Sequence, residues 1–255
     1  MTQSAGRLFL LYHELRPSRS DYSYALQTME FEEQLNFFLK LREGTSTLWP
    51  EITFDDGHIS NFEHALPALQ SRNLRAHFFI TAGWTGNKPG YMGWQELRAL
   101  VEAGQVIGAH GWSHTLLTHC NATELHHELS DAKLTLEDHL GTAVTTMSLP
   151  GGRYNSRVLD SCYKAGYTQV FTSIPKAERD LAAPTIGRLN IRGNMTLDWL
   201  ARLFQPGDKL LSSLERQYRR KATAKALMGD ALYEKLWSIL NRKEPETGAG
   251  ETRRT

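Results

Sequence analysis

Short apolar runs alternate with amphipathic segments through about residue 200 of this 255-residue chain. Each apolar run has the length of a buried strand and ends at polar or glycine residues. The expected strands cover residues 7–15, 51–54, 76–81, 105–109, 145–149, 168–173 and 189–192. Helical periodicity between them predicts helices over 31–41, 61–74, 94–103, 123–140 and 156–165. This alternation is typical of a parallel α/β fold.

Polar residues follow several of the predicted strands at the point where each strand ends. Asp55, His110 and Pro150 each come directly after the last apolar residue of such a run. The carboxyl ends of parallel strands hold the active sites of α/β proteins. We therefore expect these residues to meet at one end of the sheet.

Composition narrows the function without naming it. The chain has 29 Lys and Arg against 28 Asp and Glu, a net charge of +1, which argues against a protein that coats nucleic acid. With 40% hydrophobic residues the chain can bury one large core, and no apolar run reaches the roughly 18 residues of a membrane span. The first twelve residues do not have a signal peptide's profile, and Cys120 and Cys162 form no metal or redox motif, so we expect free thiols in a cytoplasmic protein.

The C-terminal part has a different character. We divide the chain into a barrel over 1–205, a basic and amphipathic helical extension over 206–243, and a disordered tail over 244–255. Apolar positions predict a helix over 226–240. Our first interpretation of 209–242 is a helical hairpin that covers the barrel. The alternative is contact with a membrane surface or with a glycan-assembly partner.

Two motifs carry the chemistry, Thr53-Phe54-Asp55-Asp56-Gly57 and His110-Gly111-Trp112-Ser113-His114. Adjacent carboxylates at a strand end repel each other unless a cation or proton separates them. Histidines at i and i+4 can direct both imidazoles at one ion, and one carboxylate with two histidines leaves positions open for water and substrate. Asp-Asp-Gly alone is often a simple turn, and a histidine pair alone is often solvated. The combination favours a catalytic metal site.

These motifs resemble those of the polysaccharide deacetylases, the NodB-homology carbohydrate esterases. Thr53–Gly57 matches the family's first motif in full, His110–His114 matches the second, and Pro150-Gly151-Gly152 is similar to the core of the third. The resemblance covers about residues 7–200. It implies a distorted (β/α) barrel of the NodB-homology type and metal-dependent hydrolysis of N-acetyl groups on a sugar.

The resemblance also implies roles for individual residues. Asp55 would be the general base, and Asp56, His110 and His114 would hold one divalent metal, zinc first, with cobalt or nickel as alternatives. The backbone N–H of Gly151 would help to bind the oxyanion. Many relatives have an arginine two residues before the third-motif proline, whereas this chain has Ser148. Three arginines could replace it: Arg153, Arg188 or Arg192.

The general acid departs from the common pattern as well. All ten histidines lie at or before residue 139, so the Leu-x-His motif that many relatives carry near the C-terminus is absent. Leu11-Tyr12-His13 has the same form at the end of the first strand, an arrangement similar to deacetylases that act on poly-N-acetylglucosamine. We therefore expect His13 to be the acid, with a buried structural histidine as the alternative and His58 as the next candidate.

Two further residues are candidates for binding the sugar. Trp112 lies between the two metal histidines and could stack on a sugar ring, although core packing is as good an interpretation. His58 follows the aspartate pair and could line the substrate cleft. Trp84 and Tyr91 are weaker candidates for stacking.

The sequence therefore predicts a zinc hydrolase of carbohydrate metabolism that removes N-acetyl groups from an N-acetylated sugar or polysaccharide precursor. A role in exopolysaccharide biosynthesis would place it in the cytoplasm or at the inner face of the membrane. Two alternatives remain open: a deacylase of another linkage, an O-acetyl ester or a non-sugar amide, or a non-catalytic carbohydrate-binding relative.

Overall fold

The computed structural model describes residues 6–44 and 46–228 of the chain. Seven parallel strands form the main sheet, in the order β8-β7-β6-β5-β4-β1-β9. Their bounds are β1 Gly6–Tyr12, β4 Leu48–Phe54, β5 Ala76–Ile80, β6 Val106–Ala109, β7 Thr146–Ser148, β8 Gln169–Phe171 and β9 Arg188–Asn190. Strands β2 Glu14–Arg16 and β3 Ala25–Gln27 form a separate parallel pair.

The main sheet closes almost completely into a barrel. Ile186, two residues before β9, bridges Phe171 of β8 in parallel orientation, and its N–H donates to the carbonyl of Val170 at 2.9 Å. Ile186 also packs with Phe9, Phe79 and Phe171 in a buried cluster. The predicted distorted (β/α) barrel is therefore confirmed.

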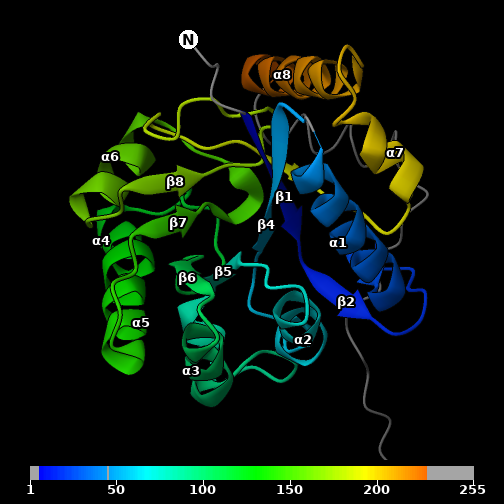
Figure 1. The fold of residues 1–255 in the computed structure, drawn as a ribbon. Helices are drawn as coiled ribbons and strands as arrows, with labels where there is room; N and C mark the ends of the chain where they lie inside the picture. The colour runs from blue at the N-terminus through cyan, green and yellow to red at the C-terminus, as the bar shows by residue number, and fades with distance from the viewer. Residues whose placement is uncertain (1–5, 45, 229–255) are drawn as a thin grey trace, which may run out of the picture. The chain divides into compact units, whose positions relative to one another are not determined.

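Helices surround the strands and bury their apolar faces (Figure 1). They are α1 Thr28–Glu43, α2 Leu66–Gln70, α3 Trp94–Glu102, α4 Ala122–His126, α5 Ala132–Leu140, α6 Ser156–Lys164 and α7 Leu197–Arg202. One more helix, α8 Leu210–Met228, follows them in the chain. Phe31, Leu35 and Phe38 of α1 show why: they recur at helical spacing and are buried.

Three predicted elements are interrupted in the structure. The expected strand over 7–15 breaks at His13, whose carbonyl accepts a 2.7 Å hydrogen bond from the Asn61 side chain instead of continuing a ladder. The expected helix over 61–74 begins as a π turn, Asn61–Ala65, and ends at Gln70. The expected helix over 123–140 contains a π turn at His127–Asp131. Such turns often occur near functional sites.

The helical extension is described only in part. Helix α8 lies within the predicted 206–243 segment, and its residues from Ser213 to Met228 belong to a second compact unit. The rest of the predicted 226–240 helix and the 244–255 tail lie outside the described residues. Among the described helices, none has the length and apolar character needed to cross a bilayer.

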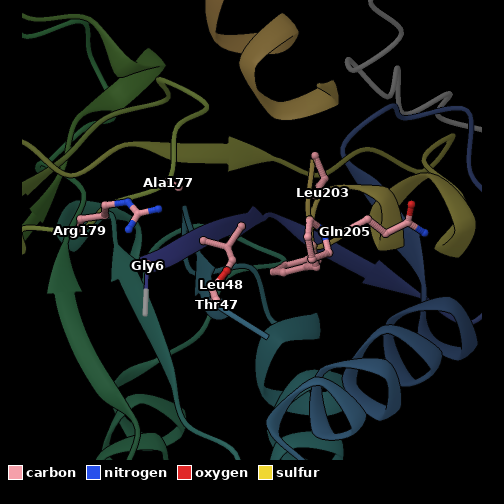
Figure 2. A pocket seen from close by; sticks show the side chains of 9 residues that line it. Gly6, Thr47, Leu48, Ala177, Arg179, Leu203 and Gln205 are labelled. Carbon is pink, nitrogen blue, oxygen red and sulfur yellow. The ribbon is translucent and has the colours of Figure 1, made fainter. Parts of the chain in front are cut away.

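A hollow opens at the N-terminal end of the barrel strands (Figure 2). Gly6 and Leu48, the first residues of β1 and β4, line it together with Leu203. The polar motifs follow the other ends of these strands, so this hollow is not the candidate active site.

Candidate active site

Strand β4 delivers two consecutive carboxylates to the C-terminal end of the barrel. The Asp55 N–H donates to the carbonyl of Tyr12 at 3.0 Å and extends the pairing of β4 with β1. Asp56 then takes a left-handed backbone with φ of 72°, which aspartate tolerates better than most residues. This change of direction lets the two neighbouring carboxylates meet different partners.

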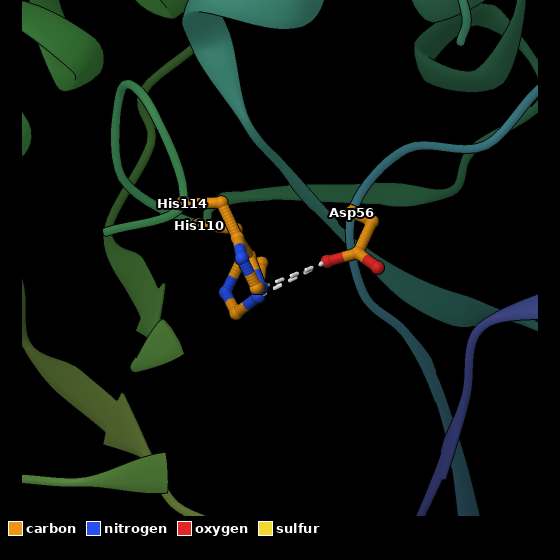
Figure 3. Close-up of side chains that lie close together, drawn as sticks. All are labelled: Asp56, His110 and His114. Atoms are coloured by element: carbon orange, nitrogen blue, oxygen red, sulfur yellow. Dashed lines mark ion pairs between the residues drawn. The ribbon is translucent and has the colours of Figure 1, made fainter. Parts of the chain in front are cut away.

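Asp56 meets the two histidines of the second motif (Figure 3). His110 follows β6, and its N–H donates to the carbonyl of Ile80 at 2.8 Å. His114 lies four residues later and itself has a left-handed backbone, with φ of 64°. The Nε2 atoms of His110 and His114 each lie 3.3 Å from Oδ1 of Asp56. The three ligand atoms all lie within 4.8 Å of one another.

These three side chains fit a divalent metal ion. Oδ1 of Asp56 is buried and accepts no hydrogen bond, which is costly unless a cation takes that place. Nδ1 of His110 bonds the carbonyl of Ser148 at 2.8 Å, so its Nε2 is the nitrogen that faces the site. One carboxylate oxygen and two imidazole nitrogens are a ligand set that leaves room for water and substrate.

Asp55 is held by a different partner, the fully buried Arg188 of β9. The guanidinium donates to both carboxylate oxygens, Nη1 to Oδ1 at 2.7 Å and Nη2 to Oδ2 at 2.8 Å. The Ser148 hydroxyl lies between them: it donates to Asp55 Oδ2 at 2.9 Å and accepts from Arg188 Nη2 at 2.6 Å. Of the three arginines that the sequence left open, Arg188 is therefore the one that binds this carboxylate.

Opposing effects set the charge of the two aspartates. Burial raises the pKa of Asp55, but Arg188 and His110 outweigh it and hold the pKa well below its usual range. Burial also raises the pKa of Asp56, while the close imidazole of His110 outweighs that effect and holds the pKa below its usual range. Both carboxylates are therefore ionised at neutral pH.

His13 lies at the same end of the barrel, in the break between β1 and β2. Its Nδ1 is buried without a hydrogen-bond partner, and its ring lies 4.9 Å from the ring of Tyr24. Burial lowers the pKa of His13, and the charges of Asp56 and Asp55 offset part of that effect. The predicted acid is thus close enough to both carboxylates to feel their charge.

The predicted substrate residues lie around this centre in different ways. Gly151 lies in the turn that follows β7, with a left-handed φ of 63°. The Nδ1 of His58 is 2.8 Å from the Ser60 hydroxyl, and the ring contacts Tyr91 edge-on. The Trp112 ring instead packs against His127, with ring centroids 4.6 Å apart.

Sequence reasoning missed two residues that shape the site. Ser148 was noted only as a departure from the family's arginine, yet its hydroxyl bridges the Asp55–Arg188 pair. Glu128 was not considered at all, although it is buried and accepts hydrogen bonds from the 110–114 loop. The signal for Glu128 was an acidic residue within the apolar positions of a helix.

Comparisons with known proteins point to one protein family. Residues 49–170 match the family model for polysaccharide deacetylase. The chain is 27% identical to YxkH of Bacillus subtilis (strain 168) over 215 residues. This alignment covers 76% of this chain and 75% of YxkH. The deacetylase PplD of Streptococcus pyogenes, in complex with acetate, superposes with a TM-score of 0.67 at 19% identity, over 79% of this chain and 99% of PplD. IcaB from Ammonifex degensii superposes with a TM-score of 0.65 at 23% identity, over 84% of this chain and 98% of IcaB.

The fold is a (β/α) barrel with a candidate metal site at the C-terminal end of its strands. The family match identifies residues 49–170 as a polysaccharide deacetylase domain, which confirms the resemblance seen in the motifs. Members of this family are carbohydrate esterases and amide hydrolases, so the prediction of an enzyme is confirmed as well.

Proposed function

We propose that this protein removes N-acetyl groups from an N-acetylated sugar or polysaccharide precursor, using one divalent metal ion, zinc in the first instance. One observation carries the proposal. The ligand atoms of Asp56, His110 and His114 all lie within 4.8 Å of one another. Beside them is the ionised Asp55, whose two carboxylate oxygens are held by Arg188. This arrangement separates a ligand carboxylate from a carboxylate that is free to exchange a proton.

A divalent ion held by Asp56, His110 and His114 would polarise the acetyl carbonyl and acidify a water molecule. Asp55 accepts the proton of the attacking water on a carboxylate oxygen. Arg188 and Ser148 fix the plane of that carboxylate, because each of its oxygens receives at least one hydrogen bond from them. Arg188 keeps Asp55 ionised and a weak base, which suits a water molecule whose own pKa has been lowered.

The remaining steps fall to two residues that follow other strands, Gly151 after β7 and His13 after β1. The Gly151 N–H would donate to the carbonyl oxygen as negative charge develops on it. His13 would give a proton to the nitrogen as the carbon–nitrogen bond breaks, so that acetate and a free amine leave. Because burial lowers the pKa of His13, the neighbouring aspartates must favour its protonated form during this step.

The setting of the reaction is also part of the proposal. A sugar precursor made in the cytoplasm or at the inner face of the membrane would be the substrate, in exopolysaccharide biosynthesis. Contact with a membrane or a glycan-assembly protein would run through residues 209–242. The basic character of this segment, with Lys209, Arg216 and Arg219 among its members, supports such contact.

The test combines metal analysis with a substrate panel. Purified protein loaded with Zn²⁺ should release acetate from N-acetylglucosamine oligomers faster than from an O-acetylated sugar or a non-sugar acetamide. Asp56→Ala, His110→Ala and His114→Ala should each remove most of the bound metal and nearly all of the activity, because three ligands leave little redundancy. Full metal content in all three variants would refute the metal site. Faster cleavage of the ester or the acetamide would show that the enzyme acts on that linkage instead of the N-acetyl sugar.

A further inference from the structure

The loop that carries the two histidines depends on outside support. Two of its residues have left-handed backbones, Gly111 with φ of 78° and His114 with φ of 64°. For a residue with a Cβ such as His114 this conformation is strained. The His114 side chain is also 37% exposed, so packing alone does not fix it. The rings of Trp84 and His110 contact the His114 ring, but they do not support the left-handed backbone of the loop.

Glu128 accepts hydrogen bonds from the middle of that loop. Its Oε2 accepts from the N–H of Trp112 at 2.7 Å and from the N–H of Ser113 at 3.0 Å. Its Oε1 accepts from the Ser113 hydroxyl at 2.5 Å. Glu128 is only 3% exposed, so these bonds form away from water. All of these partners donate hydrogen bonds to Glu128. A carboxylate has two acceptor oxygens to receive them, whereas an amide has only one acceptor oxygen and an NH₂ group that is itself a donor.

The fold brings Glu128 to this place through a local irregularity. Glu128 lies in the π turn His127–Asp131 between α4 and α5. A Cβ at Gly111 would lie 2.8 Å from Oε2 of Glu128, so the carboxylate fits because position 111 is glycine. On the loop's backbone, the Gly111 carbonyl accepts from the Ala82 N–H at 3.0 Å. The loop is therefore held from two separate segments.

We propose that Glu128 is a positioning residue of the metal site, one that presets the 110–114 loop so that His114 can bind the ion without first being ordered. This inference rests on the proposed function, since it assumes that Asp56, His110 and His114 hold the metal. Groups that orient metal ligands from outside typically change the metal affinity 10- to 100-fold when they are replaced. A site that must order its ligands on binding loses affinity by that ordering cost.

The test is the Zn²⁺ affinity of Glu128→Gln, measured by competition with a chelator. The replacement keeps the size of the side chain but turns an NH₂ group toward N–H donors, so we expect a dissociation constant about 10-fold higher or more. Glu124→Gln is the matched control. Glu124 lies one turn earlier, is exposed, and accepts a 2.7 Å hydrogen bond from the Asn121 backbone.

A second readout separates positioning from general stability. Thermal unfolding should give Glu128→Gln a smaller rise in Tm on zinc addition than the control, because the stabilisation by zinc grows with the logarithm of the zinc concentration divided by the dissociation constant. If Glu128→Gln does not fold, Ser113→Ala removes only the hydroxyl contact and should weaken zinc binding a few-fold.

The outcomes distinguish this inference from the proposed function. Zinc affinity in Glu128→Gln and in Ser113→Ala within twofold of that of Glu124→Gln would overturn the inference alone. Wild-type protein that binds no zinc would overturn both the inference and the metal site.

Discussion

Arg188 and Asp55, which are 133 residues apart in the sequence, form a fully buried bidentate ion pair. The pair exists because β1 lies between β4 and β9 in the sheet. Its geometry is the planar fork that arginine presents to a carboxylate. The carboxylate that we propose as the base is thus oriented from a strand on the far side of β1.

Replacing Arg188 should affect stability and turnover together. Arg188→Met leaves a buried carboxylate without its cation, and we expect the free energy of unfolding to fall by about 3 kcal/mol or more. The double variant Asp55→Asn/Arg188→Met should recover part of this loss, because it removes the unpaired charge. Urea unfolding of the wild type, both single variants and the double variant measures the coupling. Strictly additive losses would show that the pair does not act as a unit.

Arg188→Lys tests orientation rather than charge. Lysine keeps a positive charge but cannot donate to both oxygens in the same plane, so we expect turnover to drop by roughly 10-fold or more while metal content stays unchanged. Wild-type turnover in this variant would mean that the planar clamp on Asp55 is not needed for the reaction.

His13→Gln tests the general acid. We expect turnover on the amide substrate to fall by roughly 10² to 10⁴ with metal content unchanged. An activated ester, whose leaving group needs little protonation, should be cleaved with a much smaller loss. An equal fractional loss on both substrates would make His13 a structural histidine and direct the search to His58.

The pH dependence of the wild type should carry the signature of His13. Burial lowers its pKa below the usual 6.5, so its protonated form declines as the pH rises through that lowered value. An acid must be protonated to act, so kcat/KM should decrease on the alkaline side. His13→Gln should lose that decrease, as a pH–rate profile of both proteins will show.

His77 makes the barrel sensitive to acid. Burial among rings, including Phe79 and Phe171, lowers its pKa to about 4, and Arg188 adds to the effect. In the unfolded chain His77 has its usual pKa of 6.5. Between pH 6.5 and pH 4 the unfolded chain therefore binds more protons at His77 than the folded protein does, and the folded state loses stability as the pH falls. The loss should reach about 2 kcal/mol at pH 5.

His77→Phe should therefore lose less stability than the wild type between pH 7.5 and pH 5. Urea unfolding at the two pH values gives the difference, with His126→Asn as a control at an exposed histidine. A pH dependence identical to that of the wild type would show that His77 does not titrate as its surroundings imply.

Most of the fold follows from local patterns. The apolar runs of β4, β5 and β6 are buried on both faces, so they are readable as strands, and the motifs at their ends place Asp55 and His110 at one end of a parallel sheet. The metal cluster was predictable for the same reason, because its three residues come from two short motifs.

The rest depends on long-range contacts that no local pattern encodes. Choosing Arg188 over Arg153 and Arg192 required knowing that β9 pairs with β1 in a register that sets Leu10 opposite Leu189. The break at His13 depends on a hydrogen bond from Asn61, 48 residues away. The inward position of Glu128 depends on a π turn, which adds one residue to a helix that otherwise has ordinary periodicity.

Acetate release by Asp55→Asn at matched zinc content tests the central claim most directly. The substitution keeps the shape of the side chain and removes the carboxylate that would accept the proton of the attacking water. We predict full zinc occupancy and a loss of turnover of roughly 10²-fold or more on N-acetylglucosamine oligomers. Turnover near that of the wild type with the zinc in place would contradict the account.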